Sequence, residues 1–242
     1  MSAPIEDYAL IGDGRTAALI GRDGSLDWLC WPRFDSAACF ARLLGSDEHG
    51  SWSIAPAQPA ASVTRRYLPG TLVLETDFET DSGAVRLIDF MPVGAATSSV
   101  VRLVVGLRGR VTMRLAVALR FDYGALMPWV EPRQDGLVAR AGPDLVALHA
   151  PVAIHADHRC SHAEFCVTGG QRLAFVLSHG SSTAPVPAAL DAQRALSDTC
   201  TYWQDWIARF QRPTDWPEPV RRSLLTLQAL IHRHNGHAER RF

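Results

Sequence analysis

The sequence contains no lysine, and its 24 basic residues, all arginine, are balanced by 25 acidic residues to a net charge of −1. This balance excludes a general positive field that would attract nucleic acid. No apolar run reaches the roughly 18 residues that a membrane-spanning helix needs. The first seven residues also lack the charged-then-apolar pattern of a secretion signal. We therefore expect neither a nucleic-acid nor a membrane partner.

Cysteine is scarce and odd in number, because the chain holds five. An odd count without a secretion signal favours free thiols in a reducing compartment. The sequence therefore predicts a cytoplasmic protein. The cysteines are Cys30, Cys39, Cys160, Cys166 and Cys200.

Alternating apolar and polar residues are the main structural signal in the 242-residue chain. Between Val111 and Phe121 every second residue is large and apolar, which is typical of a strand with one buried face. Residues 100–107 form another apolar run, and we expect Gly109 and Arg110 to turn the chain between two strands. Further short runs with glycine turns between them predict an antiparallel sandwich. These runs are residues 8–11, 16–20, 25–30, 72–78, 84–91, 137–140, 145–150, 163–168 and 172–178.

The pattern changes near Ser181, where a small, proline-rich stretch begins. Apolar residues then recur at spacings of three and four, which predicts two amphipathic helices. We expect Ser197 or Asp198 to cap the first, and the second to begin at Asp215-Trp216-Pro217. The prediction is a mainly β, antiparallel super-sandwich over residues 1–180 and a helical linker over 181–231. An atypical, disordered tail over 232–242 follows.

We also expect the two helices to expose an apolar stripe. Its predicted members are Trp203, Trp206, Ile207, Phe210, Leu224, Leu227 and Ile231.

Several motifs, in order along residues 4–230, resemble the N-terminal region of glycoside hydrolase family 15, the glucoamylase and trehalase-like enzymes. The two longest are IEDYALIGDGRTAAL at 5–19 and RDGSLDWLCWPRFDS at 22–36. The others are FDYG at 121–124, PWV at 128–130, AGPD at 141–144, YWQDW at 202–206 and RRSLLTL at 221–227.

This resemblance implies a β-sandwich, a helical linker and then an (α/α)6 barrel that hydrolyses α-glucosidic bonds with two carboxylic acids. Both acids lie in the barrel, and this sequence departs from the family pattern after about Leu230. The resemblance therefore implies a non-catalytic N-terminal domain whose partner is a barrel and whose sugars are α-glucosides. One alternative is a stand-alone carbohydrate-binding or regulatory module that docks a separate barrel protein. A second alternative is an active glucosidase that uses unrecognised acids within the sandwich. A barrel reading frame after the codon for Phe242 would favour the first hypothesis.

The aromatic segment from Asp27 to Phe40 is the first candidate site. Its aromatic rings suit stacking on sugars, and its charged groups suit hydroxyls, but the same rings also suit a core or a surface that docks the barrel. The candidates for substrate or barrel contact are Trp28, Trp31, Arg33, Phe34 and Asp35.

Other clusters give weaker signals, and we predict no catalytic residue, no metal site and no cofactor in this chain. A zinc site from residues 155–166 lacks a standard ligand spacing, so a solvated turn is favoured; its members are His155, Asp157, His158, Cys160, His162 and Cys166. No spacing selects a catalytic pair from the carboxylates Asp89, Asp122, Glu131 and Glu164. Cys30 and Cys160 lack the surroundings of a nucleophile. We expect His232, His234 and His237 to belong to the disordered tail, and weak metal binding by such a cluster is the alternative.

Overall fold

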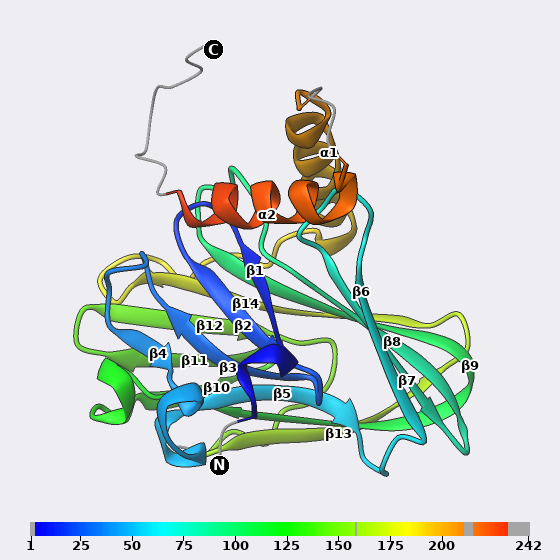
Figure 1. Ribbon diagram of the computed structural model, residues 1–242. Coiled ribbons are helices and arrows are strands. Elements are labelled where there is room, and N and C mark those ends of the chain that lie inside the picture. Colours follow the sequence, from blue (N-terminus) through cyan, green and yellow to red (C-terminus); the bar gives the residue numbers. More distant parts are fainter. Residues whose placement is uncertain (1–2, 158, 211–214, 232–242) are drawn as a thin grey trace.

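The computed structural model describes residues 3–157, 159–210 and 215–231, and within them the strands form two packed antiparallel layers (Figure 1). The predicted mainly β sandwich followed by two helices is confirmed. Sheet A runs β1 (Tyr8–Gly12), β2 (Ala17–Gly21), β3 (Ser25–Cys30), β5 (Ser51–Pro56), β9 (Ser99–Ala118) and β13 (Ser161–Thr168), with β4 (Ala38–Phe40) beside β3. Sheet B runs β6 (Ser62–Tyr67), β7 (Leu74–Thr80), β8 (Gly83–Phe90), β9, β14 (Arg172–Ser181), β12 (Asp144–His149), β11 (Gly136–Ala141) and β10 (Trp129–Arg133). Short 3-10 turns are η1 (Ile5–Asp7), η2 (Arg42–Leu44), η3 (Asp47–His49) and η4 (Asp122–Gly124).

The core lies between the two sheets. On β9 the alternating residues Val111, Met113, Leu115 and Val117 are each at most 3% exposed. They share one apolar cluster with inward-facing residues of sheet B, such as Leu87 on β8. The predicted buried face of this strand is therefore confirmed.

The turn predicted at Gly109 and Arg110 is wrong, because β9 continues through these residues and belongs to both sheets. Its first half pairs with β8 and β14, and its second half pairs with β5 and β13. Gly109 does take a positive φ of 66°, and a Cβ there would lie 2.2 Å from the Ser82 carbonyl oxygen. The glycine thus permits a close backbone approach where the strand changes sheets, and it does not reverse the chain.

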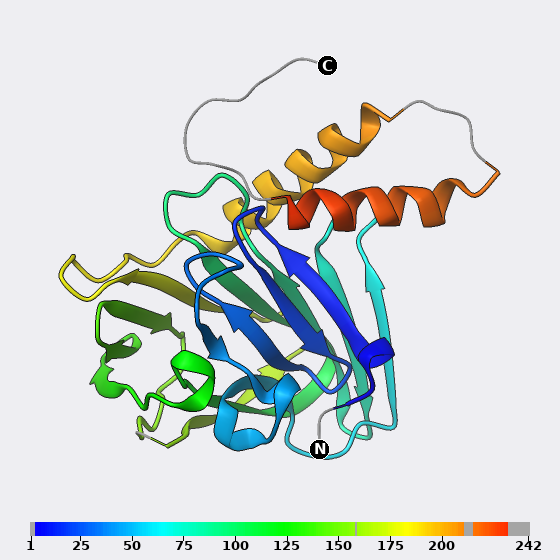
Figure 2. The ribbon, with the colours of Figure 1, turned by 60° about the vertical axis from the view of Figure 1, so that its left-hand side comes forward.

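The helices α1 (Ala192–Ala208) and α2 (Pro217–Leu230) lie together across one end of the sandwich (Figures 1 and 2). The cap of α1 is Asp191, whose side chain accepts hydrogen bonds from two backbone amides, so the helix begins earlier than predicted. For α2 the predicted start is confirmed, with Trp216 as the cap and Pro217 at the first position. Among the described helices, none combines the length and apolar character needed to cross a membrane.

The expected apolar stripe is only partly exposed. Trp203 and Ile207 of α1 are 2% and 8% exposed, because they pack with Leu72 of the sandwich and with Leu225 of α2. By contrast Leu227 is 59% exposed, so the apolar surface left open belongs to α2. The helices are therefore part of the core at this end of the molecule.

One ion pair, between Arg102 on β9 and Asp89 on β8, is completely buried. Arg102 Nε donates to Asp89 Oδ1 at 2.8 Å, and its two terminal nitrogens donate to the carbonyl oxygens of Trp52 and Gly24 at 2.6 and 2.7 Å. The guanidinium also lies 5.0 Å from the centroid of the Trp52 ring. Burial raises the pKa of Asp89, and the charge of Arg102 opposes that rise. A single side chain therefore connects both sheets through the core.

Candidate functional site

A β-bulge in β3 turns Trp28 toward the outside of sheet A. Leu19 of β2 pairs with Trp28, but the next residue, Ile20, pairs with Leu26, so Asp27 is an extra residue without a partner. Leu26 and Leu29 remain in the core. The bulge therefore places Trp28 on the outer face of the sheet while its neighbours stay buried.

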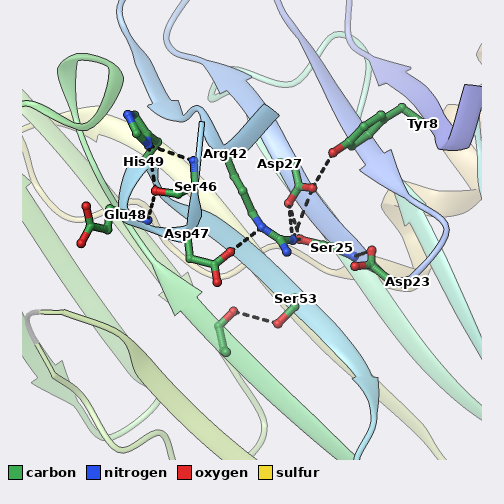
Figure 3. A network of polar contacts seen from close by, with 11 residues as sticks. Tyr8, Asp23, Ser25, Asp27, Arg42, Ser46, Asp47, Glu48, His49 and Ser53 are labelled. Carbon is green, nitrogen blue, oxygen red and sulfur yellow. Dashed lines mark hydrogen bonds and ion pairs between the residues drawn. The ribbon is translucent and has the colours of Figure 1, made fainter. Parts of the chain in front are cut away.

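A polar network around Asp27 fixes this bulge (Figure 3). Tyr8 donates its hydroxyl proton to Asp27 Oδ2 at 2.8 Å, Ser25 donates to Oδ1, and Arg42 Nη1 lies 3.2 Å from Oδ1. Burial, and then the hydrogen bond to Asp27, raise the pKa of Tyr8 to about 12. Arg42 also pairs with Asp47 at 2.6 Å. Because Asp27 is 3% exposed and its carboxylate is fully engaged, the network serves to hold the backbone in place.

An apolar hollow of about 130 Å³ opens beside Trp28. Leu10, Leu19 and Trp28 stand side by side across β1, β2 and β3. Phe34 and Leu230, the last residue of α2, complete the wall, together with Thr16, Ala17 and Cys30. The outer face of an antiparallel sheet is usually polar. We call this surface, made of Leu10, Leu19, Trp28, Phe34 and Leu230, the Trp28 face.

A strained loop borders the Trp28 face. Tyr123 in η4 lies against Trp28, with ring centroids 6.1 Å apart, and is 45% exposed. Asp122 and Tyr123 both have positive φ values, 52° and 57°, which cost roughly 1–3 kcal/mol each in non-glycine residues. Gly124 follows, where a Cβ would lie 3.2 Å from the His49 ring. The chain thus holds an exposed tyrosine beside the tryptophan at a cost in backbone energy.

The structure brings together two of the five predicted contact residues, Trp28 and Phe34. Trp31 is buried, and its indole nitrogen donates to Ser98 at 3.1 Å, so it has a packing role. Arg33 and Asp35 are exposed and form an ion pair with each other at 2.7 Å. Sugar contact by these residues stays a prediction.

Sequence patterns did not identify four residues of this site, namely Leu10, Leu19, Leu230 and Tyr123. A signal for the first two exists, because β1 and β2 read ALI and AALI without any polar alternation. Such continuous apolar strands are typical of sheets that are covered on both faces.

The weaker candidates do not converge on one site. His155 and His162 stack across a bridge with centroids 4.9 Å apart, but among the described residues no group of three metal-binding side chains forms, and His158 lies outside them. Partial burial raises the pKa of the Cys30 thiol and also that of the more exposed Cys160 thiol, so neither is activated as a nucleophile. The histidines at 232, 234 and 237, and the whole predicted tail, also lie outside the described residues.

The four carboxylates lie on different elements. Asp89 is in the core with Arg102, Glu131 pairs with Arg140, Glu164 pairs with Arg114, and Asp122 is in η4.

Comparison with known proteins points to one family. Residues 1–203 match the family described as "Trehalase-like, N-terminal". A trehalase of Mycolicibacterium smegmatis is 28% identical over 96% of this chain, and trehalase 2 of Sulfolobus acidocaldarius is 27% identical over 95% of it. The chain spans only 39% of the length of either relative.

A bacterial glucoamylase, solved with acarbose, shares the fold with a TM-score of 0.63. It is 10% identical, and the likeness covers 95% of this chain and 41% of that one. The family match covers most of the chain, and we conclude that this protein belongs to the trehalase-like N-terminal domain family.

Proposed function

We propose that this chain is the non-catalytic N-terminal domain of a family 15 glycoside hydrolase acting on α-glucosides, and that the Trp28 face docks the catalytic (α/α)6 barrel. The observation that carries the proposal is an apolar hollow on the outer face of a sheet, next to the end of α2. Within this proposal, residues 1–180 form the sandwich and 181–231 the linker. Five free cysteines support a cytoplasmic location.

The direction of the chain supports this choice of partner. The trehalase relatives are about 2.5 times longer, so most of their length lies outside the matched region. The chain leaves α2 at Leu230, which is itself part of the Trp28 face, and Leu227 and Ile231 beside it are 59% and 57% exposed. A domain that follows α2 would therefore meet this face first, and it would cover an apolar patch that water would otherwise contact.

The purified chain is expected to release no glucose from trehalose, maltose or starch. Without the barrel, both the general acid and the general base are missing, and each proton transfer is typically worth about 10²–10⁴-fold in rate. The assay is glucose release, with the Mycolicibacterium smegmatis trehalase as a positive control for trehalose. Glucose release at enzyme-like rates that one carboxylate substitution in this chain abolishes would contradict the proposal.

A domain exchange tests the docking face. In a chimera, residues 1–231 of this chain replace the matching N-terminal region of the Mycolicibacterium smegmatis trehalase. This chimera is expected to hydrolyse trehalose. Leu230→Asp and Trp28→Asp should each lower kcat/KM or soluble yield by roughly tenfold or more, because a charge would be buried in an apolar interface. The matched control is Ile5→Asp, at an equally apolar but 68% exposed position outside the face. Face variants as active as the Ile5→Asp control would argue against docking through this surface.

A further inference from the structure

The outer face of β10 and β11 presents an exposed tryptophan on a regular strand. Trp129 is 68% exposed, whereas the next residue, Val130, packs against the core. β10 is the edge strand of sheet B, and it pairs with β11 along all five of its residues. Because the strand is held on one side by β11 and below by Val130, the indole stands on an ordered backbone. The tryptophan side chain has only two rotatable bonds, so it loses little conformational entropy when a ligand binds to it.

A row of charged side chains flanks this indole. Arg140 is the cross-strand partner of Trp129, so the two side chains share the outer face at neighbouring positions. The Glu131 carboxylate lies 2.7 Å from Arg140 Nη1 and 3.3 Å from Arg133 Nη1. The three charged side chains are between 33% and 44% exposed. The face therefore combines an exposed flat ring with fixed hydrogen-bond donors and acceptors that still reach water.

The side chains on this face indicate which class of ligand fits it. Nucleic acid and free phosphate are disfavoured, because Glu131 already neutralises part of the charge of both arginines and the whole chain has a net charge of −1. A purely apolar partner would remove water from the Arg133–Glu131–Arg140 row and offer its remaining donors and acceptors no hydrogen bonds in return. A pyranose ring has an apolar face of C–H bonds and a rim of hydroxyl groups, so it matches both parts of the surface.

We propose that Trp129, together with Glu131 and Arg140, binds the sugar rings of neutral α-glucosides. The choice of α-glucosides rests on the proposed function, whereas the site itself uses only residues of sheet B. The Trp28 face, in contrast, lies on sheet A. Stacking of one glucose ring on the indole leaves its hydroxyl rim over the carboxylate and guanidinium groups. Because Trp129 is 68% exposed and stays in contact with water, affinity is modest and increases with the number of glucose units that contact it.

Titration of the full-length chain with maltotetraose and with trehalose tests the site. The chain has seven tryptophans, and their indole N–H signals in a ¹⁵N NMR spectrum report on each ring separately. We expect a saturable shift of the Trp129 signal with a dissociation constant on the order of 1 mM for maltotetraose, and weaker binding for trehalose. Trp129→Ala should weaken binding by roughly tenfold or more, and Glu131→Gln or Arg140→Ala by severalfold.

The matched control is Trp216→Ala, which removes an equally exposed tryptophan, 71% exposed, at the start of α2. This variant should bind sugar like the parent, and circular dichroism should show that every variant remains folded. Absence of any saturable shift at sugar concentrations of about 20 mM would overturn the inference, as would a folded Trp129→Ala variant that binds like the parent. The domain exchange requires no sugar binding to sheet B, so either proposal can fail while the other stands.

Discussion

Replacing Arg102 by leucine is expected to lower the free energy of unfolding by about 3–5 kcal/mol. The substitution leaves the Asp89 carboxylate fully buried without its counter-ion. It also removes the donors to the Trp52 and Gly24 carbonyl oxygens, which tie sheet A to sheet B. Removing one member of a buried ion pair costs more than removing both, because the remaining charge has lost its solvation and its partner.

Urea denaturation followed by circular dichroism measures this effect. The control is Arg114→Leu, which is the same substitution on the same strand. Arg114 is 62% exposed, and its ion pair with Glu164, at 3.4 Å, lies at the surface. That variant should change stability by less than about 1 kcal/mol. The double variant Arg102→Leu with Asp89→Leu should regain part of the loss. An Arg102→Leu protein as stable as Arg114→Leu would show that the buried pair does not hold the sheets together.

Leu115→Asp is expected to be at least as damaging, with a loss above about 4 kcal/mol or failure to fold. Leu115 is completely buried between the sheets and pairs across strands with Ile54 and Ala163. An aspartate there would have no ion-pair partner in the core cluster, which is made of apolar side chains. The carboxylate would therefore either remain charged in an apolar environment or take up a proton at a cost.

The neighbouring change, Arg114→Asp, is the matched control because the same residue is introduced one position away. Its side chain points to solvent beside Glu164, so the expected loss is about 1 kcal/mol or less, from repulsion between two acids. Thermal melts of both variants decide the question. If Leu115→Asp melted like the parent while Arg114→Asp collapsed, the register of β9 would be inverted.

The faces of β9 could be predicted from sequence because residues 111–117 keep a strict period of two. The same rule fails in β3, where it would put Leu26 and Trp28 on one face. The bulge at Asp27 breaks the period, so Leu26 is buried and Trp28 faces outward. No local sequence pattern predicts a bulge of this kind, because the side chains that bond to Asp27 include Tyr8 and Arg42, which lie elsewhere in the chain.

The sequence pattern does not predict the short strands β5 and β10, for a related reason. β5 contains only two buried apolar residues, Trp52 and Ile54, and it ends at a proline. β10 also contains a proline, Pro132, which is tolerated there because the strand is at an edge. The contribution of Leu230 to the Trp28 face depends on how α2 packs on the sandwich, and that packing includes Arg222 stacking on Tyr67 at 3.9 Å. Local sequence gives no information on such long-range contacts.

The sharing of β9 between the two sheets has a consequence for how the chain folds during synthesis. The partners of β9 are made at very different times, because β5 and β8 precede it while β13 and β14 extend to Ser181. Neither sheet can therefore be completed until β13 and β14 have left the ribosome. Once closed, the sheets should also open together, since releasing β9 from one of them strains its pairing in the other. Amide protons on both sheets should then exchange with solvent at a common, slow rate set by global unfolding.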